Sequence, residues 1–232
     1  ITIKETVESN RGELLYLSAQ YSTPVVGFLV NLLIMRFVSP ATLGVYQSII
    51  LWSSYLPFLQ LGVFNGLNRN LSYYKGAGRT DEISTASSTG FVYSIIISLL
   101  SLFVVFLISR TNINNHSTIG FWAFLMLALT AFTQPLITFF DTLYRTGYEF
   151  KKLGRFIIIE NSVFAISSFL MLIDGYIGFV IQNLLKLIIS FCLRSFDKVK
   201  KLRFKFSLTS FIEQISTGFP ILLNSYLYST FF

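Results

Sequence analysis

The chain has 232 residues, of which 53% are hydrophobic and only 12% are charged, and its net charge is +7. Since ordinary soluble domains carry about 25% charged residues, this chain has too few to cover a water-soluble surface. The basic residues lie between uninterrupted apolar blocks and not on one exposed face, which excludes a soluble nucleic-acid-binding protein. The sequence therefore predicts an integral membrane protein.

The apolar blocks are long enough to cross a membrane, because a helix that spans the hydrocarbon needs roughly 20 apolar residues. Residues 156–173 and 176–193 each carry one charge and are expected to form a helical hairpin around Asp174 and Gly175. A last block starts near residue 217 and is short of a full span, so we expect the chain to end inside a helix. Four earlier blocks contain no Asp, Glu, Lys or Arg and are expected to form the first four spans: 14–35, 45–64, 89–109 and 119–140.

The first block is too long for a cleavable signal peptide and is expected to stay in the membrane. The predicted fold is thus an all-α polytopic transmembrane bundle with six complete spans and the start of a seventh. With six spans, 15 of the 18 Lys and Arg residues fall on one side, Arg36 and Arg110 fall on the other, and Lys186 lies within a helix. Because cytoplasmic loops retain positive charge, this asymmetry predicts a cytoplasmic N-terminus and short outer connections.

Three regions are expected along the chain: a six-helix lobe over residues 1–195, a connector over 196–216 and a further span that begins at 217 and runs to 232. The basic connector indicates an amphipathic helix on the inner leaflet, or alternatively a solvated loop retained by its charge. Its apolar residues recur at spacings of three to five: Val199, Leu202, Phe206, Phe211 and Ile215.

Two ionisable residues lie inside predicted spans, where a charge costs about 2.5–3.5 kcal/mol at the bilayer centre on insertion scales. Glu160 lies one turn into its helix and Lys186 lies in the other helix of the hairpin, so a contact between them is geometrically possible. In one interpretation Glu160 and Lys186 line a polar cavity that binds an anionic head group or relays an ion. In the other, Glu160 sits at the interface and Lys186 extends to it. Gln182 and Asn183 make this part of the helix more polar.

Arg36 and Arg69 are further candidates for a substrate cavity. Interfacial anchoring explains Arg69, whereas Arg36 lies on the outer side and departs from the charge rule. Three prolines lie within predicted spans and should bend them, which suits a transporter but also occurs as a packing feature: Pro24, Pro57 and Pro135.

Catalytic and metal-binding chemistry is not expected. Cys192 is the single cysteine and lies in an apolar block, so the sequence has no disulfide framework. The single histidine, His116, has no carboxylate or cysteine near it in the sequence and is expected to be an exposed residue of an outer loop. The tripeptide Asn115-His116-Ser117 fits the glycosylation pattern, which is frequent by chance. We expect no cofactor.

Three stretches of the sequence carry a family resemblance. Residues 35–46 (MRFVSPATLGVY) and 61–71 (LGVFNGLNRNL) resemble the first two helices of the polysaccharide biosynthesis proteins, the Wzx-type flippases of lipid-linked O-antigen and capsule units. Residues 216–223 (STGFPILL) resemble the Gly-x-Pro opening of the seventh helix of that family. The family belongs to the multidrug, oligosaccharidyl-lipid and polysaccharide exporter superfamily.

The resemblance implies a two-lobed transporter, of which this sequence covers the first lobe, with a cationic cavity for the sugar and pyrophosphate of an undecaprenyl-linked unit. Arg36 and Arg69 match arginine positions of the family. It implies a flippase of the bacterial inner membrane, not an enzyme, that contacts lipid-linked oligosaccharide, membrane lipid and other polysaccharide assembly proteins, but no nucleic acid. Two alternatives stay open: a membrane enzyme such as an O-antigen polymerase or acyltransferase, and a drug exporter of the same superfamily.

Overall fold

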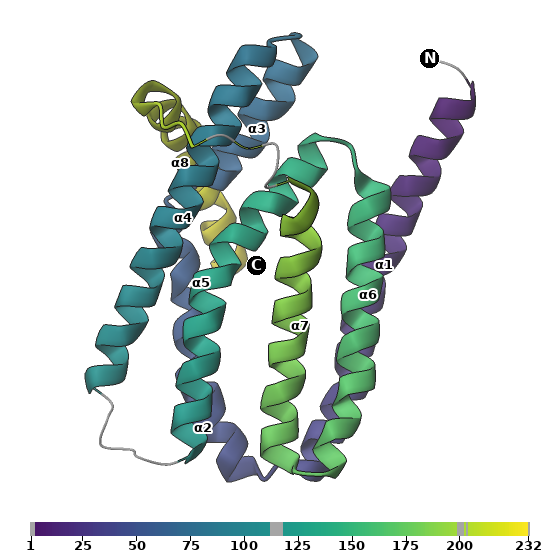
Figure 1. Ribbon diagram of the computed structural model, residues 1–232, viewed down its shortest axis with the longest axis vertical. Coiled ribbons are helices and arrows are strands. Elements are labelled where there is room, and N and C mark those ends of the chain that lie inside the picture. Colours follow the sequence, from purple (N-terminus) through teal and green to yellow (C-terminus); the bar gives the residue numbers. More distant parts are fainter. Residues whose placement is uncertain (1–2, 112–117, 199–201, 203, 232) are drawn as a thin grey trace.

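The computed structural model describes residues 3–111, 118–198, 202 and 204–231, and every regular element in these ranges is helical. Figure 1 shows long helices packed side by side, with successive ones running in opposite directions. The all-α prediction is confirmed. In chain order the elements are α1 (Ile3–Phe37), α2 (Pro40–Ile50), the 3-10 helix η1 (Leu51–Gln60), α3 (Val63–Gly76), α4 (Thr80–Thr111), α5 (Thr118–Thr146), α6 (Phe150–Ser167), the 3-10 helix η2 (Ser168–Leu172), α7 (Gly175–Lys198) and α8 (Leu208–Phe231).

The described helices are those of a polytopic membrane protein. Five segments match the predicted first, third, fourth, fifth and sixth spans, while the total number of spans and the cytoplasmic N-terminus remain predictions. These segments are long and apolar enough to cross a membrane: Arg11–Phe37, Thr80–Arg110, Thr118–Thr146, Phe150–Leu172 and Gly175–Phe196.

The faces of α4 show how the sequence suits a lipid environment. Ser94, Ser98 and Ser101 follow one another at helical spacing and are completely buried. Leu99 and Phe103, on the other face, are each more than half exposed. Small polar residues thus face neighbouring helices and large apolar residues face outward, which is the pattern of helices that pack inside a bilayer.

The predicted second span, residues 45–64, is wrong as a single helix. It is divided among α2, η1 and α3, with Pro57 inside η1. Leu61 and Gly62 then adopt left-handed backbone conformations, with φ of 48° and 75°. Proline removes a helical hydrogen bond and left-handed residues end a helix, which explains the break. In Figure 1 the three pieces together still run from one end of the bundle to the other.

The predicted connector over 196–216 also differs from the structure. α7 continues to Lys198, Leu202 and residues 204–207 are not helical, and α8 already begins at Leu208. The connector is therefore not one surface helix, and the seventh helix starts nine residues earlier than the predicted 217. Residues 199–201 and 203, the loop residues Asn115-His116-Ser117 and Phe232 lie outside the described residues. The division into lobes stays a prediction.

α8 packs closely against α3 through glycines. A Cβ on Gly66 would lie 1.9 Å from the backbone oxygen of Gln214, and one on Gly218 would lie 2.0 Å from the backbone oxygen of Gly62. The Tyr74 hydroxyl donates to Oε1 of Glu213 at 2.6 Å near the end of this contact. Burial raises the pKa of Tyr74 to about 12, so this phenol keeps its proton at neutral pH.

The predicted hairpin around Asp174 and Gly175 is confirmed. Oδ1 of Asp174 accepts a hydrogen bond from the backbone N–H of Ile177 at 3.0 Å and so caps α7. Figure 1 shows the C-terminal ends of α5 and α7 and the N-terminal end of α6 at the same end of the bundle. The side chains in the last turns of α5 and α7 therefore meet those in the first turns of α6.

Candidate functional site

A cavity of about 380 Å³ lies between α1, α5, α6 and α7, near the end of the bundle where α5 and α7 finish. Polar and charged side chains make up most of its lining, although it lies within segments apolar enough to span a membrane. Such groups are costly in a bilayer and usually face protein or water. Five charged side chains contribute to the lining: Asp141, Arg145, Glu160, Lys186 and Arg194.

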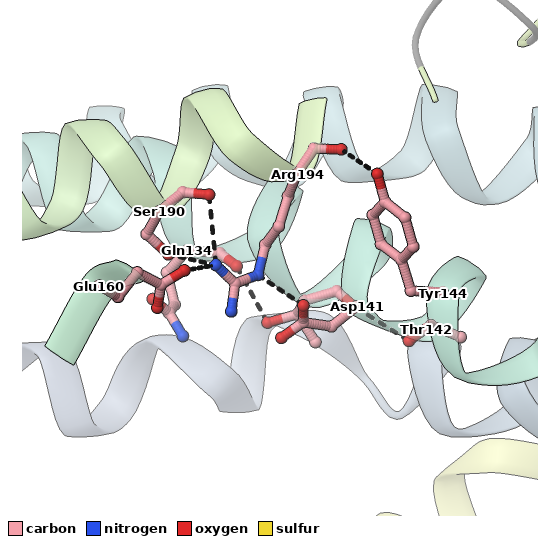
Figure 2. Close-up of polar contacts among 8 residues, drawn as sticks. Gln134, Asp141, Thr142, Tyr144, Glu160, Ser190 and Arg194 are labelled. Carbon is pink, nitrogen blue, oxygen red and sulfur yellow. Dashed lines mark hydrogen bonds and ion pairs between the residues drawn. The ribbon is translucent and has the colours of Figure 1, made fainter. Parts of the chain in front are cut away.

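Arg194 is the centre of a buried ion-pair cluster, drawn in Figure 2. Its Nε lies 2.5 Å from Oδ1 of Asp141 on α5, and its Nη1 donates to Oε1 of Glu160 on α6. The same Nη1 lies 2.8 Å from the hydroxyl of Ser190, one turn earlier on α7. Arg194 is only 5% exposed and Glu160 only 8%. One guanidinium thus joins three helices through two carboxylates.

Tyr144 of α5 also fixes the backbone at Arg194. The hydroxyl of Tyr144, which is fully buried on α5, donates to the carbonyl of Arg194 at 3.3 Å. The ring of Tyr144 packs edge-on against Phe156 of α6, with centroids 5.4 Å apart. These contacts fix the end of α7 against α5 and α6, so the guanidinium is directed at the two carboxylates, as Figure 2 shows.

The charged side chains give the cavity lining a net positive charge. Asp141 and Glu160 carry two negative charges against one on Arg194, while Lys186 and Arg145 add two positive charges. The net charge of the lining is therefore +1 with all five groups ionised. The Lys186 ammonium lies 4.4 Å from the ring centre of Phe164, and Arg145 is exposed. An anion that enters the cavity would meet these two cations, because the Arg194 guanidinium already pairs with two carboxylates.

The structure brings Glu160 and Lys186, both singled out from the sequence, into one cavity. Glu160, however, makes its ion pair with Arg194. Gln182 is completely buried and donates from Nε2 to the Phe164 carbonyl at 2.8 Å, so it joins α7 to α6. Asn183 donates to the Phe179 carbonyl of its own helix.

Arg36 and Arg69 are not among the residues that line this cavity. Arg36 is exposed in the last turn of α1, and its guanidinium carbon lies 5.7 Å from the ring centre of Phe37. Arg69 is exposed on α3. The described part of the chain therefore keeps both arginines apart from the charged cluster.

Sequence reasoning missed Asp141, Arg145 and Arg194, because each lies just past the end of a predicted span, where charged residues are common. A signal was nevertheless present. Asp141 and Arg194 each directly follow a predicted span, and Glu160 lies one turn inside the opposite end of an antiparallel helix. Helices that alternate in direction bring these three positions to a similar depth.

The bundle and its charged cavity define a polytopic helical membrane protein with a polar site among its spans. A sequence model of a family described as polysaccharide biosynthesis protein matches residues 32–231, which is most of the chain. The chain belongs to this family of polysaccharide biosynthesis proteins. No curated protein and no solved structure matched it significantly. The matched range contains all five charged residues of the cavity, whereas the α1 residues of the lining precede it.

Proposed function

We propose that this chain forms part of a flippase that moves undecaprenyl-pyrophosphate-linked oligosaccharide across the bacterial inner membrane during O-antigen or capsule assembly. The observation that carries the proposal is a cavity whose lining has a net positive charge, among membrane-spanning helices of a polysaccharide biosynthesis protein. A lipid-linked sugar has a polar, anionic part that must cross the apolar core of the bilayer. A polar cavity between helices offers that part a path that bare lipid does not.

Lys186 and Arg145 are the groups we propose for the pyrophosphate. Both line the cavity, and neither takes part in the ion-pair cluster of Arg194. Transport of this kind needs no covalent step, since the substrate leaves unchanged. It needs instead a site that opens to one side of the membrane and then to the other.

Glu160 is the group we propose for ion coupling, because its carboxylate lies in the cavity and is one of the two carboxylates paired with Arg194. Protonating it would remove one ion pair and weaken the connection of α6 to α7. Bent or broken helices would favour such movement, and Pro24 of α1 lines the same cavity. Coupling by this route is a proposal that rests on the flippase assignment.

The proposal is tested with the intact protein purified into liposomes that contain a fluorescent undecaprenyl-pyrophosphate oligosaccharide. Translocation is measured as the fraction of labelled lipid that reaches the opposite leaflet, where a membrane-impermeant quencher can reach its fluorophore. We expect translocation above that of protein-free liposomes, and a loss of about tenfold in Lys186→Ala, comparable to removing a charged hydrogen bond. Arg155→Ala, an exposed site on α6 outside the cavity lining, is the matched control and should transport normally.

Three outcomes would contradict the flippase. Polymer or acylated product formed from the same substrate, without translocation, would identify a membrane enzyme. Movement of lipophilic cations but not of the lipid-linked sugar would identify a drug exporter. Equal quenching with and without protein would reject transport altogether.

A further inference from the structure

A second cavity, of about 410 Å³, lies between the C-terminal ends of α3 and α5 and the N-terminal part of α4. It is lined by Lys75 and by serine and threonine side chains, above an apolar wall that includes Leu71 and Leu143. Among the described residues that line it, Lys75 is the only charged one. None of its lining residues belongs to the Arg194 cluster.

The serines of this cavity have hydroxyl groups that the fold does not use. Ser84, Ser87 and Ser88 lie on one face of α4, at the three- and four-residue spacings that place side chains together on a helix. Ser88 is only 3% exposed. Within the described residues none of the three side chains forms a hydrogen bond, whereas Thr89 next to them donates to the Thr85 carbonyl at 2.9 Å. The Ser88 hydroxyl itself is not sealed off from the cavity, although the residue is buried, so it is available to donate to a ligand acceptor there.

Lys75 supplies the charge of the cavity. Its ammonium donates to the carbonyl of Thr146 at 3.2 Å and lies 4.4 Å from the ring centre of Tyr148. An ammonium has three N–H donors, so the contact with Thr146 leaves two for a ligand. The cavity thus offers several hydroxyl donors and one cation, the combination that suits a phosphate group.

The position of the cavity indicates the source of that phosphate. Lys75 is near the end of α3, Thr80 begins α4 and Thr146 ends α5, so the cavity lies at the end of the bundle. Residues 89–109 of α4, which contain no Asp, Glu, Lys or Arg, follow directly after the serines of this cavity. A ligand there would have a polar part at the membrane boundary and an apolar part along Leu71 and Leu143, as an amphiphile does.

We propose that this cavity binds the phosphodiester head group of an anionic glycerophospholipid of the surrounding leaflet. The hydroxyls of Ser84, Ser87 and Ser88 donate to the phosphate oxygens, and Lys75 balances the charge. The bound lipid fixes the ends of α3, α4 and α5 against one another. This inference does not depend on the flippase, because none of these residues belongs to the charged cavity proposed for transport.

The test uses the intact protein in detergent, titrated with phosphatidylglycerol and analysed by native mass spectrometry. We expect one tightly bound phosphatidylglycerol, and affinity lower by about tenfold or more in Ser87→Ala/Ser88→Ala and in Lys75→Gln, because each loses hydrogen bonds to a charged group. Two matched controls should bind as the parent protein does. Ser72→Ala removes a hydroxyl that donates to the Asn68 carbonyl on an exposed face, and Lys151→Gln changes an exposed residue of α6.

Thermal unfolding of each variant without lipid separates lost binding from lost folding, and the Ser→Ala changes are small enough to keep the fold. Three results would overturn the proposal: equal affinity in the cavity variants and the controls, equal binding of zwitterionic phosphatidylcholine, or displacement of phosphatidylglycerol by millimolar inorganic phosphate. The last would assign the cavity to a soluble phosphate and not to a lipid.

Discussion

Nε of Arg194 lies 2.5 Å from Oδ1 of Asp141, a contact that joins residues 53 positions apart in the chain and fixes α7 to α5. The second carboxylate, Glu160, brings α6 into the same cluster. Removing one partner of a buried ion pair leaves an uncompensated charge, which costs more than the pair itself contributes. The cluster is therefore a point at which single substitutions should have large effects on stability.

Arg194→Met should lower the free energy of unfolding by about 3–5 kcal/mol, because it leaves Asp141 and Glu160 without their counter-ion. The measurement is thermal or denaturant unfolding of the intact protein in detergent. Adding Asp141→Asn and Glu160→Gln to Arg194→Met should recover part of the loss, since neither carboxylate is then left charged without the Arg194 guanidinium. If the triple variant were less stable than Arg194→Met alone, the carboxylates would have other partners.

Arg145→Ala should reduce transport of the lipid-linked sugar by about tenfold while it changes stability little, because an exposed side chain outside the ion-pair cluster contributes little to folding. Transport is measured in liposomes and stability by thermal unfolding. Arg36→Ala and Arg69→Ala test the earlier assignment from the family resemblance. Loss of transport in these two variants but not in Arg145→Ala would exclude the cavity as the substrate path.

Gly66→Ala should destabilise the protein by about 1–3 kcal/mol, the usual cost of overpacking, because its Cβ would lie 1.9 Å from the Gln214 backbone oxygen. Gly44→Ala in the interior of α2 is the matched control, since a Cβ there meets nothing within 4 Å. This control should be neutral or stabilising by up to about 1 kcal/mol, because alanine favours a helix more than glycine does. Equal unfolding temperatures for the two variants would mean that α3 and α8 are not in close contact.

Asn161 of α6 donates to Ser22 at 3.1 Å and to Thr23 at 3.0 Å, directly before Pro24 of α1. Interhelical hydrogen bonds of this kind contribute about 0.6 kcal/mol on average in a membrane protein, with a maximum near 1.7. A double-mutant cycle of Asn161→Ala and Thr23→Val, followed by thermal unfolding, should give a coupling energy in this range. Additive effects of the two substitutions would show that the hydrogen bond does not stabilise the α1–α6 contact.

The helical class, the positions of five long apolar helices and the hairpin around Asp174 were predictable from the sequence, because each depends on neighbouring residues. A run of apolar residues predicts a helix in lipid, and Asp174-Gly175 predicts a turn. The break in the second span was less visible. Pro57 was noted as a bend, but the left-handed conformations of Leu61 and Gly62 accompany the close approach of Gly62 to Gly218, more than 150 residues later.

The residues of the candidate site also fall into two groups, those predictable from the sequence and those that only the packing of the helices brought together. Glu160 and Lys186 were recognisable because a charge inside an apolar run is visible in the sequence itself. Asp141 and Arg194 lie at the ends of such runs, where charges are common, so hydropathy could not distinguish an anchor from an ion-pair partner. Composition and periodicity are local properties and could establish that this chain lies in a membrane. Which charges pair depends on which helices are neighbours, and the packing of α5, α6 and α7 alone brings Asp141, Glu160 and Arg194 together.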